Sequence, residues 1–303
     1  MIKQLGMEEL FKLYKAYWDK AYKNDISSAS PIISILEFNR KQISDTPFWS
    51  IYCKSFCERK PKLVSDFFQV PEEQKIAFAG PHLFMMNAAP LCRYHSMFLP
   101  YFKDKAEQEI IKAEDISLNV ELLKASKDPE LRVLFNSLKA GASMNHLHFH
   151  LIITKELYGE TKLPIERCNP GSLISTPLLN IYKQTKDTYA IPHFMIKCTK
   201  PLDDKACKAI ADTSFKLINA IKEARKAYNL IMGDEGSSLY IVPRNEVSGA
   251  TLGNGAIECC GIVICLNPDT YNDVDQKVIM KHFEMLAIKD EELNEIESIF
   301  LKS

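Results

Sequence analysis

Three histidines at alternate positions, His146, His148 and His150, form the part of the sequence with the clearest chemical content. Three of the seven histidines of the chain lie within these five positions, with Leu147 and Phe149 between them. Alternate side chains of a β-strand share a face, so a strand here would place the imidazoles on one side and the apolar groups on the other. Buried imidazoles need hydrogen-bond partners, and a core that serves only packing rarely holds three together.

Three kinds of chemistry are compatible with this pattern. A zinc site is one, but no Cys, Asp or Glu follows at ligand spacing, and a strand would hold the outer histidines about 13 Å apart. A second is a set of hydrogen-bonded core histidines without a chemical role. The third, which we favour, is covalent catalysis at phosphorus, in which the central imidazole attacks and its neighbours orient it and donate to phosphoryl oxygens.

A loop of small residues just before the histidines supports the third interpretation. Gly141, Ala142 and Ser143 would let backbone N–H groups approach a phosphate, and the Ser143 hydroxyl adds a further donor. Asn136 begins this segment, so we expect it to touch the substrate. Imidazole suits the reaction because its neutral form attacks, its protonated form leaves, and it titrates near neutral pH.

The composition limits the partners and the compartment. The 303 residues include 38 Lys and Arg against 39 Asp and Glu, so the formal net charge of -1 gives no electrostatic reason to expect nucleic acid or a membrane as partner. No apolar run approaches the roughly 20 residues of a membrane span, and the first residues lack a signal-peptide core. The nine cysteines contain no CxxC pair and suit a reducing compartment, so we expect a cytoplasmic, globular protein.

Strands and helices are expected around the histidines. Strand-like runs joined by short turns occupy 75–100, 131–136, 147–154, 230–242 and 262–266, and apolar residues at helical spacing occupy 7–23, 104–126, 202–227 and 290–302. Strand pairs interrupted by helices indicate an α+β fold rather than a doubly wound parallel sheet. The hairpins that end at Pro100 and Pro243 look like two copies of one unit.

The histidine motif and the segments around it resemble the histidine-triad superfamily and, within it, the GDP-hexose phosphorylases, which include the GDP-D-glucose and GDP-L-galactose enzymes. The resemblance is carried by residues 135–138, 142–149 and 163–166, by Asn87, Pro90, His95 and Pro100 upstream, and by residues 228–231, 240–243 and 258–261 downstream. Residues 1–70 match little of this pattern.

The resemblance implies a fold of two histidine-triad-like halves with antiparallel sheets and flanking helices. We expect an N-terminal helical or extended arm at 1–69, a half with the histidines at 70–157, a connector at 158–184, and a degenerate second half at 185–303 that shapes the nucleotide site.

The implied reaction proceeds in two steps. His148 would attack the α-phosphorus of a GDP-hexose and release hexose 1-phosphate, and inorganic phosphate would then take the guanylyl group as GDP. His146 and His150 would orient and donate, and neither a metal nor another cofactor is implied. The expected partners are these small molecules, with no nucleic acid and no membrane, and the sequence leaves the oligomeric state open.

Two residues depart from the family pattern. His150 stands where the GDP-L-galactose branch usually has glutamine, which favours GDP-D-glucose as substrate. Histidine here is also typical of triad hydrolases, so three alternatives stay open. They are a nucleotide hydrolase, another nucleotidyltransferase (acting on GDP-L-galactose or a dinucleoside polyphosphate), and a catalytically silent nucleotide-binding regulatory protein. Tyr94 replaces the usual glycine before His95.

Five residues are candidates for substrate binding. Asn87 either contacts the nucleotide or caps its own turn, and Glu258 aligns with a family glutamate. The set is Asn87, Asn136, Gly141, Ser143 and Glu258.

Overall fold

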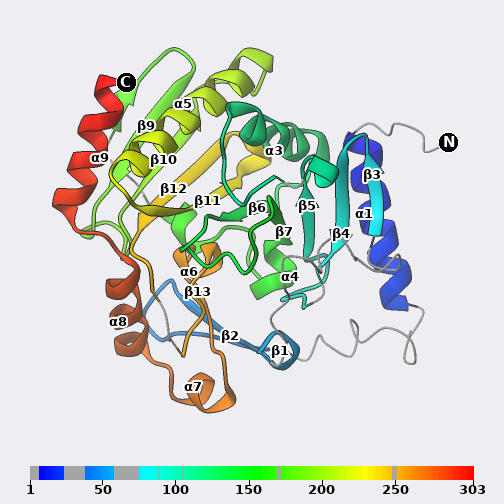
Figure 1. Cartoon of the computed structure of the whole chain (residues 1–303). Helices are drawn as coiled ribbons and strands as arrows, with labels where there is room; N and C mark the ends of the chain where they lie inside the picture. The colour runs from blue at the N-terminus through cyan, green and yellow to red at the C-terminus, as the bar shows by residue number, and fades with distance from the viewer. Residues whose placement is uncertain are drawn as a thin grey trace.

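The computed structural model describes residues 7–23, 38–57, 75–87, 89–104, 106–168, 172–247 and 251–303, and one large antiparallel sheet spans most of them (Figure 1). In spatial order its strands are β3 (Lys75–Ala79), β4 (His82–Met86), β5 (Ser96–Leu99), β7 (Phe149–Ile153), β6 (Leu131–Asn136), β11 (Ala227–Gly233), β12 (Ser238–Arg244), β10 (His193–Cys198), β9 (Leu179–Gln184) and β8 (Ser172–Ser175).

A smaller sheet and the helices cover the two faces of this large sheet. The small sheet holds β1 (Phe38–Gln42), β2 (Trp49–Cys53) and β13 (Ile262–Ile264). The helices are α1 (Met7–Lys23), α2 (Lys54–Cys57), α3 (Ala113–Ser126), α4 (Thr154–Tyr158), α5 (Asp204–Glu223), α6 (Ala256–Cys259), α7 (Pro268–Asp273), α8 (Gln276–Leu286) and α9 (Asp290–Lys302), with single 3₁₀ turns η3 (Phe102–Asp104), η4 (Pro164–Arg167) and η5 (Asp234–Gly236).

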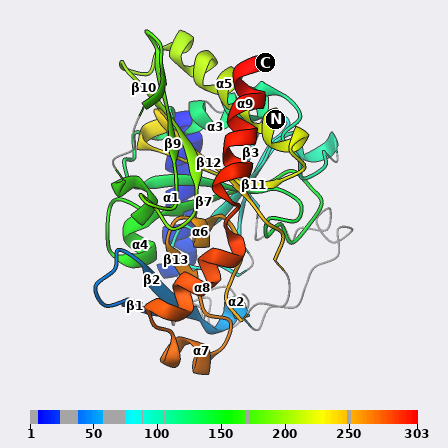
Figure 2. The ribbon, with the colours of Figure 1, turned by 90° about the vertical axis from the view of Figure 1, so that its left-hand side faces the viewer.

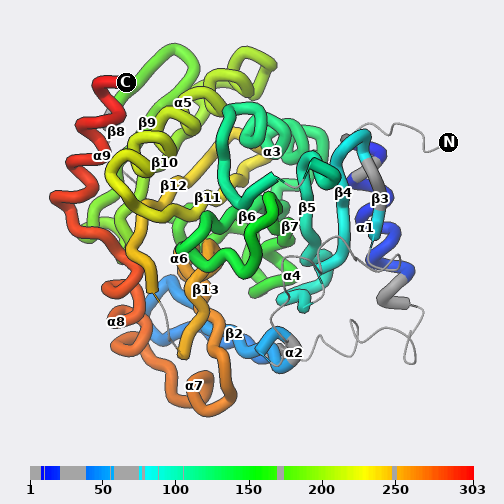
Figure 3. The backbone as a smooth tube through the Cα atoms, in the orientation of Figure 1, coloured from blue at the N-terminus to red at the C-terminus, as the bar shows by residue number. Residues whose placement is uncertain are grey.

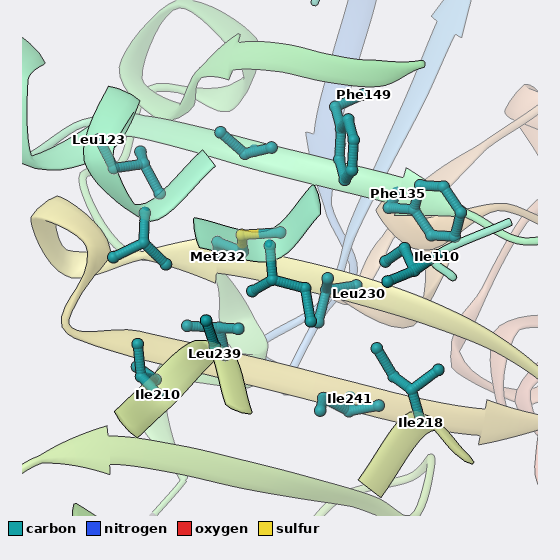
Figure 4. Close-up of a cluster of buried hydrophobic side chains, with 14 of the residues drawn as sticks. Ile110, Leu123, Phe135, Phe149, Ile210, Ile218, Leu230, Met232, Leu239 and Ile241 are labelled. Atoms are coloured by element: carbon teal, nitrogen blue, oxygen red, sulfur yellow. The ribbon is translucent and has the colours of Figure 1, made fainter. Parts of the chain in front are cut away.

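The strict alternation of strand side chains gives the large sheet two apolar faces. On β12, Leu239 and Ile241 face the helices α3, α5 and α9, whereas Tyr240 and Val242 face the side of the small sheet. Figure 4 shows the first of these faces, where strand residues meet helix residues such as Ile210 and Ile218. The small sheet lies with α7 and α8 at the end of the molecule away from α3 and α5 (Figures 1 and 2).

The strand order is mirrored about the pair β6–β11, which joins two halves into one sheet. Asn136 pairs with Asn229 and Phe135 with Leu230 in antiparallel register. On the β6 side the order continues with β7 and then with β5, β4 and β3. On the β11 side it continues with β12 and then with β10, β9 and β8. By this order β5, the strand before Pro100, corresponds to β10. The sequence predicts instead that it corresponds to β12, the strand that contains Pro243, so this prediction is wrong.

The α+β class and the antiparallel halves predicted from the sequence are confirmed. The hairpin expected at 230–242 is present as β11 and β12. Residues 172–184, expected within a connector, form β8 and β9 at the edge of the large sheet. Of the expected arm at 1–69, the described parts form α1, β1, β2 and α2, and β2 pairs in parallel with β13 near the other end of the chain. The backbone trace shows this return (Figure 3).

Among the helices that the structure describes, none combines the length and the apolar character needed to cross a membrane.

Candidate active site

His148 lies directly before β7, in a segment outside the strand that a buried glutamine holds. The sequence predicts a strand from residue 147, but β7 begins at Phe149, so of the three histidines the strand contains His150 alone. Gln108 takes the place of a strand partner: its Oε1 accepts from the backbone N–H of His148 at 2.8 Å, and its Nε2 donates to the carbonyl oxygens of Asn136 at 2.8 Å and His148 at 3.2 Å. The predicted alternation survives, because Leu147 and Phe149 both pack in the helix-side core.

The His148 side chain has one nitrogen bound to the backbone. Its Nδ1 lies 2.8 Å from the carbonyl oxygen of His146, and because a carbonyl only accepts, Nδ1 carries the proton and donates. Nε2 is therefore the nitrogen with the lone pair in the neutral ring. Burial lowers the pKa of His148 to about 4, so the ring is unprotonated at neutral pH. Burial also lowers the pKa of His146.

His150 receives a hydrogen bond from His95, which fixes its orientation. The backbone N–H of Leu91 donates to Nδ1 of His95 at 2.9 Å, so the ring proton of His95 lies on Nε2. That Nε2 is 3.1 Å from Nδ1 of His150, which accepts. The side-chain Nδ2 of Asn87 lies 3.1 Å from the same Nε2 and 3.5 Å from Nδ1 of His150, so this amide is a second N–H donor beside Nδ1 of His150. The proton of a neutral His150 ring is consequently on Nε2, as a donor.

A pocket of about 250 Å³ opens beside His150. Of the predicted site residues, the structure brings Asn136, Gly141, Ser143, His150 and Glu258 together in its wall. His148 and His146 are each 1% exposed and are not part of that wall; the ring of His148 packs against that of His150, with centroids 5.1 Å apart. Asn87 is also outside the wall, and its Oδ1 caps the backbone N–H of Ala89 at 2.9 Å.

The loop of small residues leaves backbone donors available. None of the described residues accepts a hydrogen bond from the backbone N–H groups of Gly141, Ala142 or Ser143. Gly141 and Ser143 line the pocket, and Ser143 is exposed. Such a run of unused N–H groups can bind an anion.

The opposite wall comes from the second half, where Glu258 fixes the loop before α6. One carboxylate oxygen accepts from the N–H of Gly255 at 2.6 Å and the other from the N–H of Ile264 at 3.3 Å. Burial raises the pKa of Glu258 to about 7. The predicted glutamate thus lies at the pocket, and its hydrogen bonds to Gly255 and Ile264 stabilise the loop that forms this wall.

Asn136 links the two walls. Its Oδ1 accepts from the N–H of Ala256 at 2.7 Å and from Nδ2 of Asn229 at 2.8 Å. Asn229 in turn accepts at Oδ1 from the buried guanidinium of Arg244, which also donates to the carbonyl of Asn254. Gln108, Asn229 and Arg244 were not among the site residues predicted from the sequence. A polar residue within an apolar strand-like run is the signal that could have found Asn229, whereas Arg244 follows Pro243 at the end of its run and has no such signal.

Within the described ranges, no cluster of three or more His, Cys, Asp or Glu residues has the arrangement of a metal site.

Comparison with protein families gives two matches. Residues 62–152 match the family model described as GDPGP1-like, N-terminal domain, and residues 176–303 match the model described as GDPGP1-like, C-terminal domain. The two matches follow the order of the chain and together include more than half of it.

Curated relatives are similar over parts of their length. GDP-D-glucose phosphorylase 1 of Danio rerio is 33% identical over 99 residues, 33% of this chain and 26% of that protein. GDP-D-glucose phosphorylase 1 of Caenorhabditis elegans is 27% identical over 151 residues, 50% of this chain and 29% of that protein. GDP-L-galactose phosphorylase 2 of Arabidopsis thaliana is 22% identical over 233 residues, 73% of this chain and 51% of that protein. The chain spans about half the length of these relatives or less.

Among solved structures, yeast Ap4A phosphorylase Apa2 in complex with Ap4A is similar over nearly the whole chain. The TM-score is 0.68 at 15% identity, and the match covers 95% of this chain and 99% of that chain. At this identity the likeness concerns the fold.

Proposed function

The chain belongs to the GDPGP1-like family, and on that premise we propose that it is a GDP-hexose phosphorylase. The substrate we favour is GDP-D-glucose, which reacts with phosphate to give glucose 1-phosphate and GDP. Two relatives named for GDP-D-glucose are 33% and 27% identical, against 22% for one named for GDP-L-galactose. His150, in the place where the latter branch usually has glutamine, supports the same choice.

The observation that carries the proposal is the hydrogen bond from Nδ1 of His148 to the carbonyl oxygen of His146. It leaves the Nε2 lone pair as the attacking group, and burial keeps the ring neutral at physiological pH. When Nε2 bonds to phosphorus the ring becomes cationic, and a hydrogen bond to a charged donor is stronger than one to a neutral donor. The carbonyl of His146 therefore stabilises the intermediate more than the resting ring.

In the first half-reaction, Nε2 of His148 forms a bond to the α-phosphorus, and the bond from that phosphorus to the bridging oxygen of the β-phosphate breaks. Hexose 1-phosphate leaves with the electron pair, and the guanylyl group stays on His148. In the second, an oxygen of inorganic phosphate attacks the same phosphorus, GDP leaves, and Nε2 regains its lone pair. His148 is 1% exposed and does not line the pocket, whereas His150 does. The scheme therefore requires the α-phosphate to move from the pocket past the His150 ring to reach Nε2 of His148.

Donors on both sides of the pocket suit the charge that develops on the phosphoryl oxygens. His150 offers Nε2–H, and the 141–143 loop offers its unused N–H groups. The guanidinium of Arg244 lies behind the other wall and contributes positive charge from the second half. We propose accordingly that residues 70–157 carry the chemistry and residues 185–303 shape the pocket.

We further propose that the protein works in the cytoplasm on small-molecule substrates. All nine cysteines are free thiols, which supports a reducing compartment.

The proposal is tested by incubating the protein with a set of nucleotide sugars, with and without phosphate, and measuring the released nucleotides. GDP-glucose, GDP-galactose and UDP-glucose separate the choice of hexose from the choice of base. GDP that forms only in the presence of phosphate supports the phosphorylase. GMP formed without phosphate would identify a hydrolase, and tight GDP binding without turnover would identify a nucleotide-binding protein.

A further inference from the structure

Tyr94, next to His95, has an unusual backbone conformation. Its φ of 66° lies in the left-handed region, where a residue with a side chain costs about 1–2 kcal/mol relative to glycine. The family pattern usually has glycine at this position, and glycine adopts a positive φ without strain. In this chain a tyrosine has to adopt the same backbone conformation. Contacts elsewhere must hold the tyrosine in this conformation.

Those contacts come from α1, which lies beside the β3 edge of the large sheet (Figure 1). The hydroxyl of Tyr94 donates to Oδ1 of Asp19 at 2.7 Å, and the hydroxyl of Tyr14 donates to the carbonyl oxygen of Tyr94. Asp19 also forms an ion pair of 2.5 Å with Arg93.

A further hydrogen bond ties α1 to the other side of His95. Nε1 of Trp18 donates to Oγ of Ser96 at 2.7 Å. Tyr14 and Trp18 are 0% and 1% exposed, so these two contacts are shielded from water. The helix therefore contacts the residues on both sides of His95, Tyr94 at its backbone carbonyl and Ser96 at its side-chain hydroxyl.

His95 makes the shorter of the two contacts to Nδ1 of His150, at 3.1 Å against 3.5 Å for the Asn87 amide, and so has the larger influence on which nitrogen of His150 is protonated. The hydrogen bonds from Leu91 to His95 and from His95 to His150, 2.9 and 3.1 Å long, exist only if the His95 ring stays between the two partners. A small displacement of residues 93–96 lengthens the second bond and allows His150 to carry its proton on Nδ1 instead. In that form His150 has no N–H on Nε2 to offer a phosphoryl group.

We infer that α1 is a positioning element for the reaction, and that Asp19 and Tyr94 are positioning residues that hold His95 and, through it, the Nε2 proton of His150. The residues of α1 precede both matched family segments, the first of which begins at residue 62. The inference rests on the proposed function for the value of that proton, but the ring geometry can be measured without turnover.

The test uses Asp19→Asn and Tyr94→Phe in the full chain. Tyr94→Phe keeps the ring and removes the hydroxyl that reaches Asp19, and Asp19→Asn weakens the contacts of that carboxylate with Tyr94 and Arg93. Glu8→Gln is the matched control, because Glu8 is an exposed carboxylate of the same helix that pairs with Lys12. Each variant is labelled with ¹⁵N-histidine, and long-range ¹H–¹⁵N spectra report which nitrogen of His150 is protonated.

We expect the control to match the parent protein. In both test variants the ¹⁵N chemical shifts of Nδ1 and Nε2 of His150 should move toward each other, as expected when the proton is shared between the two nitrogens. The kcat for phosphorolysis should fall about 3- to 10-fold, with KM for the nucleotide sugar changed less than about 2-fold. Unchanged His150 spectra in both variants would overturn the inference, whether or not the protein turns over a GDP-hexose. A loss of helix α1 docking in Asp19→Asn leaves Tyr94→Phe as the deciding variant, since its ring packing is retained.

Discussion

Gly141 and Gly255 approach so closely that a Cβ atom on Gly141 would lie 2.7 Å from the Cα atom of Gly255. One residue belongs to the loop before the histidines and the other to the loop before α6, so the two halves of the chain meet at this contact. The same Cβ would also lie 2.7 Å from the carbonyl oxygen of Asn254. The two walls therefore meet here backbone to backbone, with no room for a side chain at position 141.

Gly141→Ala should damage the pocket. The new methyl group meets backbone on the opposite wall, and the φ of 91° is itself unfavourable for alanine. We expect a loss of stability of about 2–4 kcal/mol and a fall in kcat/KM of at least about 10-fold, because the 141–143 donors move away from the pocket. Denaturant unfolding and steady-state assays measure the two effects.

Gly80→Ala is the control that measures the cost of placing alanine at a positive φ without a steric clash. Gly80 also has a positive φ, of 58°, but a Cβ there would have no atom within 4 Å. We expect a cost of about 1 kcal/mol and unchanged kinetics. Equal effects of the two substitutions would contradict the importance of the contact with Gly255.

His193 should make the protein sensitive to acid. Burial lowers the pKa of this fully buried ring to about 4 from an ordinary value of 6.5, so between these pH values the unfolded chain binds a proton that the folded protein does not. Stability is therefore complete above pH 6.5 and falls as the pH drops toward 4, by about 3 kcal/mol for this group. The raised pKa of Glu258, about 7, acts in the opposite sense.

His193→Asn removes the titrating ring and keeps a donor for the carbonyl oxygen of Ile191, which Nδ1 contacts at 2.9 Å. In urea unfolding from pH 4 to 6.5, the variant should show a slope of stability against pH lower by about one proton than the parent protein. His193→Phe lacks the donor to Ile191, so it should show the same reduced slope as His193→Asn and a lower free energy of unfolding than that variant at every pH. An unchanged slope in both variants would show that His193 binds its proton equally in the folded and unfolded states, which would contradict the lowered pKa.

Local features of the site could be predicted from the sequence because they depend on neighbouring residues. Strand alternation put Leu147 and Phe149 opposite the histidines, and the structure has both in the helix-side core. The small residues at 141–143 predicted free N–H donors, and Gly141 and Ser143 do line the pocket. The exact start of β7 was missed because Gln108, remote in sequence, replaces a strand partner for His148.

The remaining features depend on contacts between distant parts of the chain. Asn136 and Ala256 are joined by a hydrogen bond although they are 120 positions apart, and no periodic pattern encodes such a pair. Likewise, the hydrogen bond between His95 and His150 follows from the pairing of β5 with β7. Glu258 was singled out from a family match, yet its local role, to accept from Gly255 and Ile264, required the fold.

His150→Gln should leave phosphorolysis within about tenfold of the parent rate, or ~1.4 kcal/mol in barrier. A glutamine amide can accept from Nε2 of His95 and still donate toward the pocket, as His150 does. Any GMP-forming side reaction should decrease, because an amide cannot supply a proton to the leaving oxygen. His150→Phe, without a donor, should fall by about 10²-fold. Product analysis that finds GMP release unchanged and phosphorolysis lost in His150→Gln would show that His150 is a required acid.

His148 is expected to form a covalent adduct. Incubation with GDP-glucose in the absence of phosphate should add the mass of one GMP to the protein, and phosphate should discharge it as GDP. A phosphorus–nitrogen bond is labile in acid and stable in alkali, which separates it from an ester on Ser143. Intact-protein and peptide mass spectrometry locate the adduct.

His148→Ala and His148→Asn should lose both adduct and turnover by at least about 10³-fold, because no other group replaces the attacking nitrogen. His148→Asn is the better folded comparison, since its amide can still donate to the carbonyl oxygen of His146 as Nδ1 does. His146→Ala should be milder, because the group that holds His148 is the backbone carbonyl, which alanine retains. An adduct mapped to His146 or His150 would reassign the roles on this segment. Full activity of His148→Ala would rule out covalent catalysis by this imidazole, because the transfer would then proceed without Nε2.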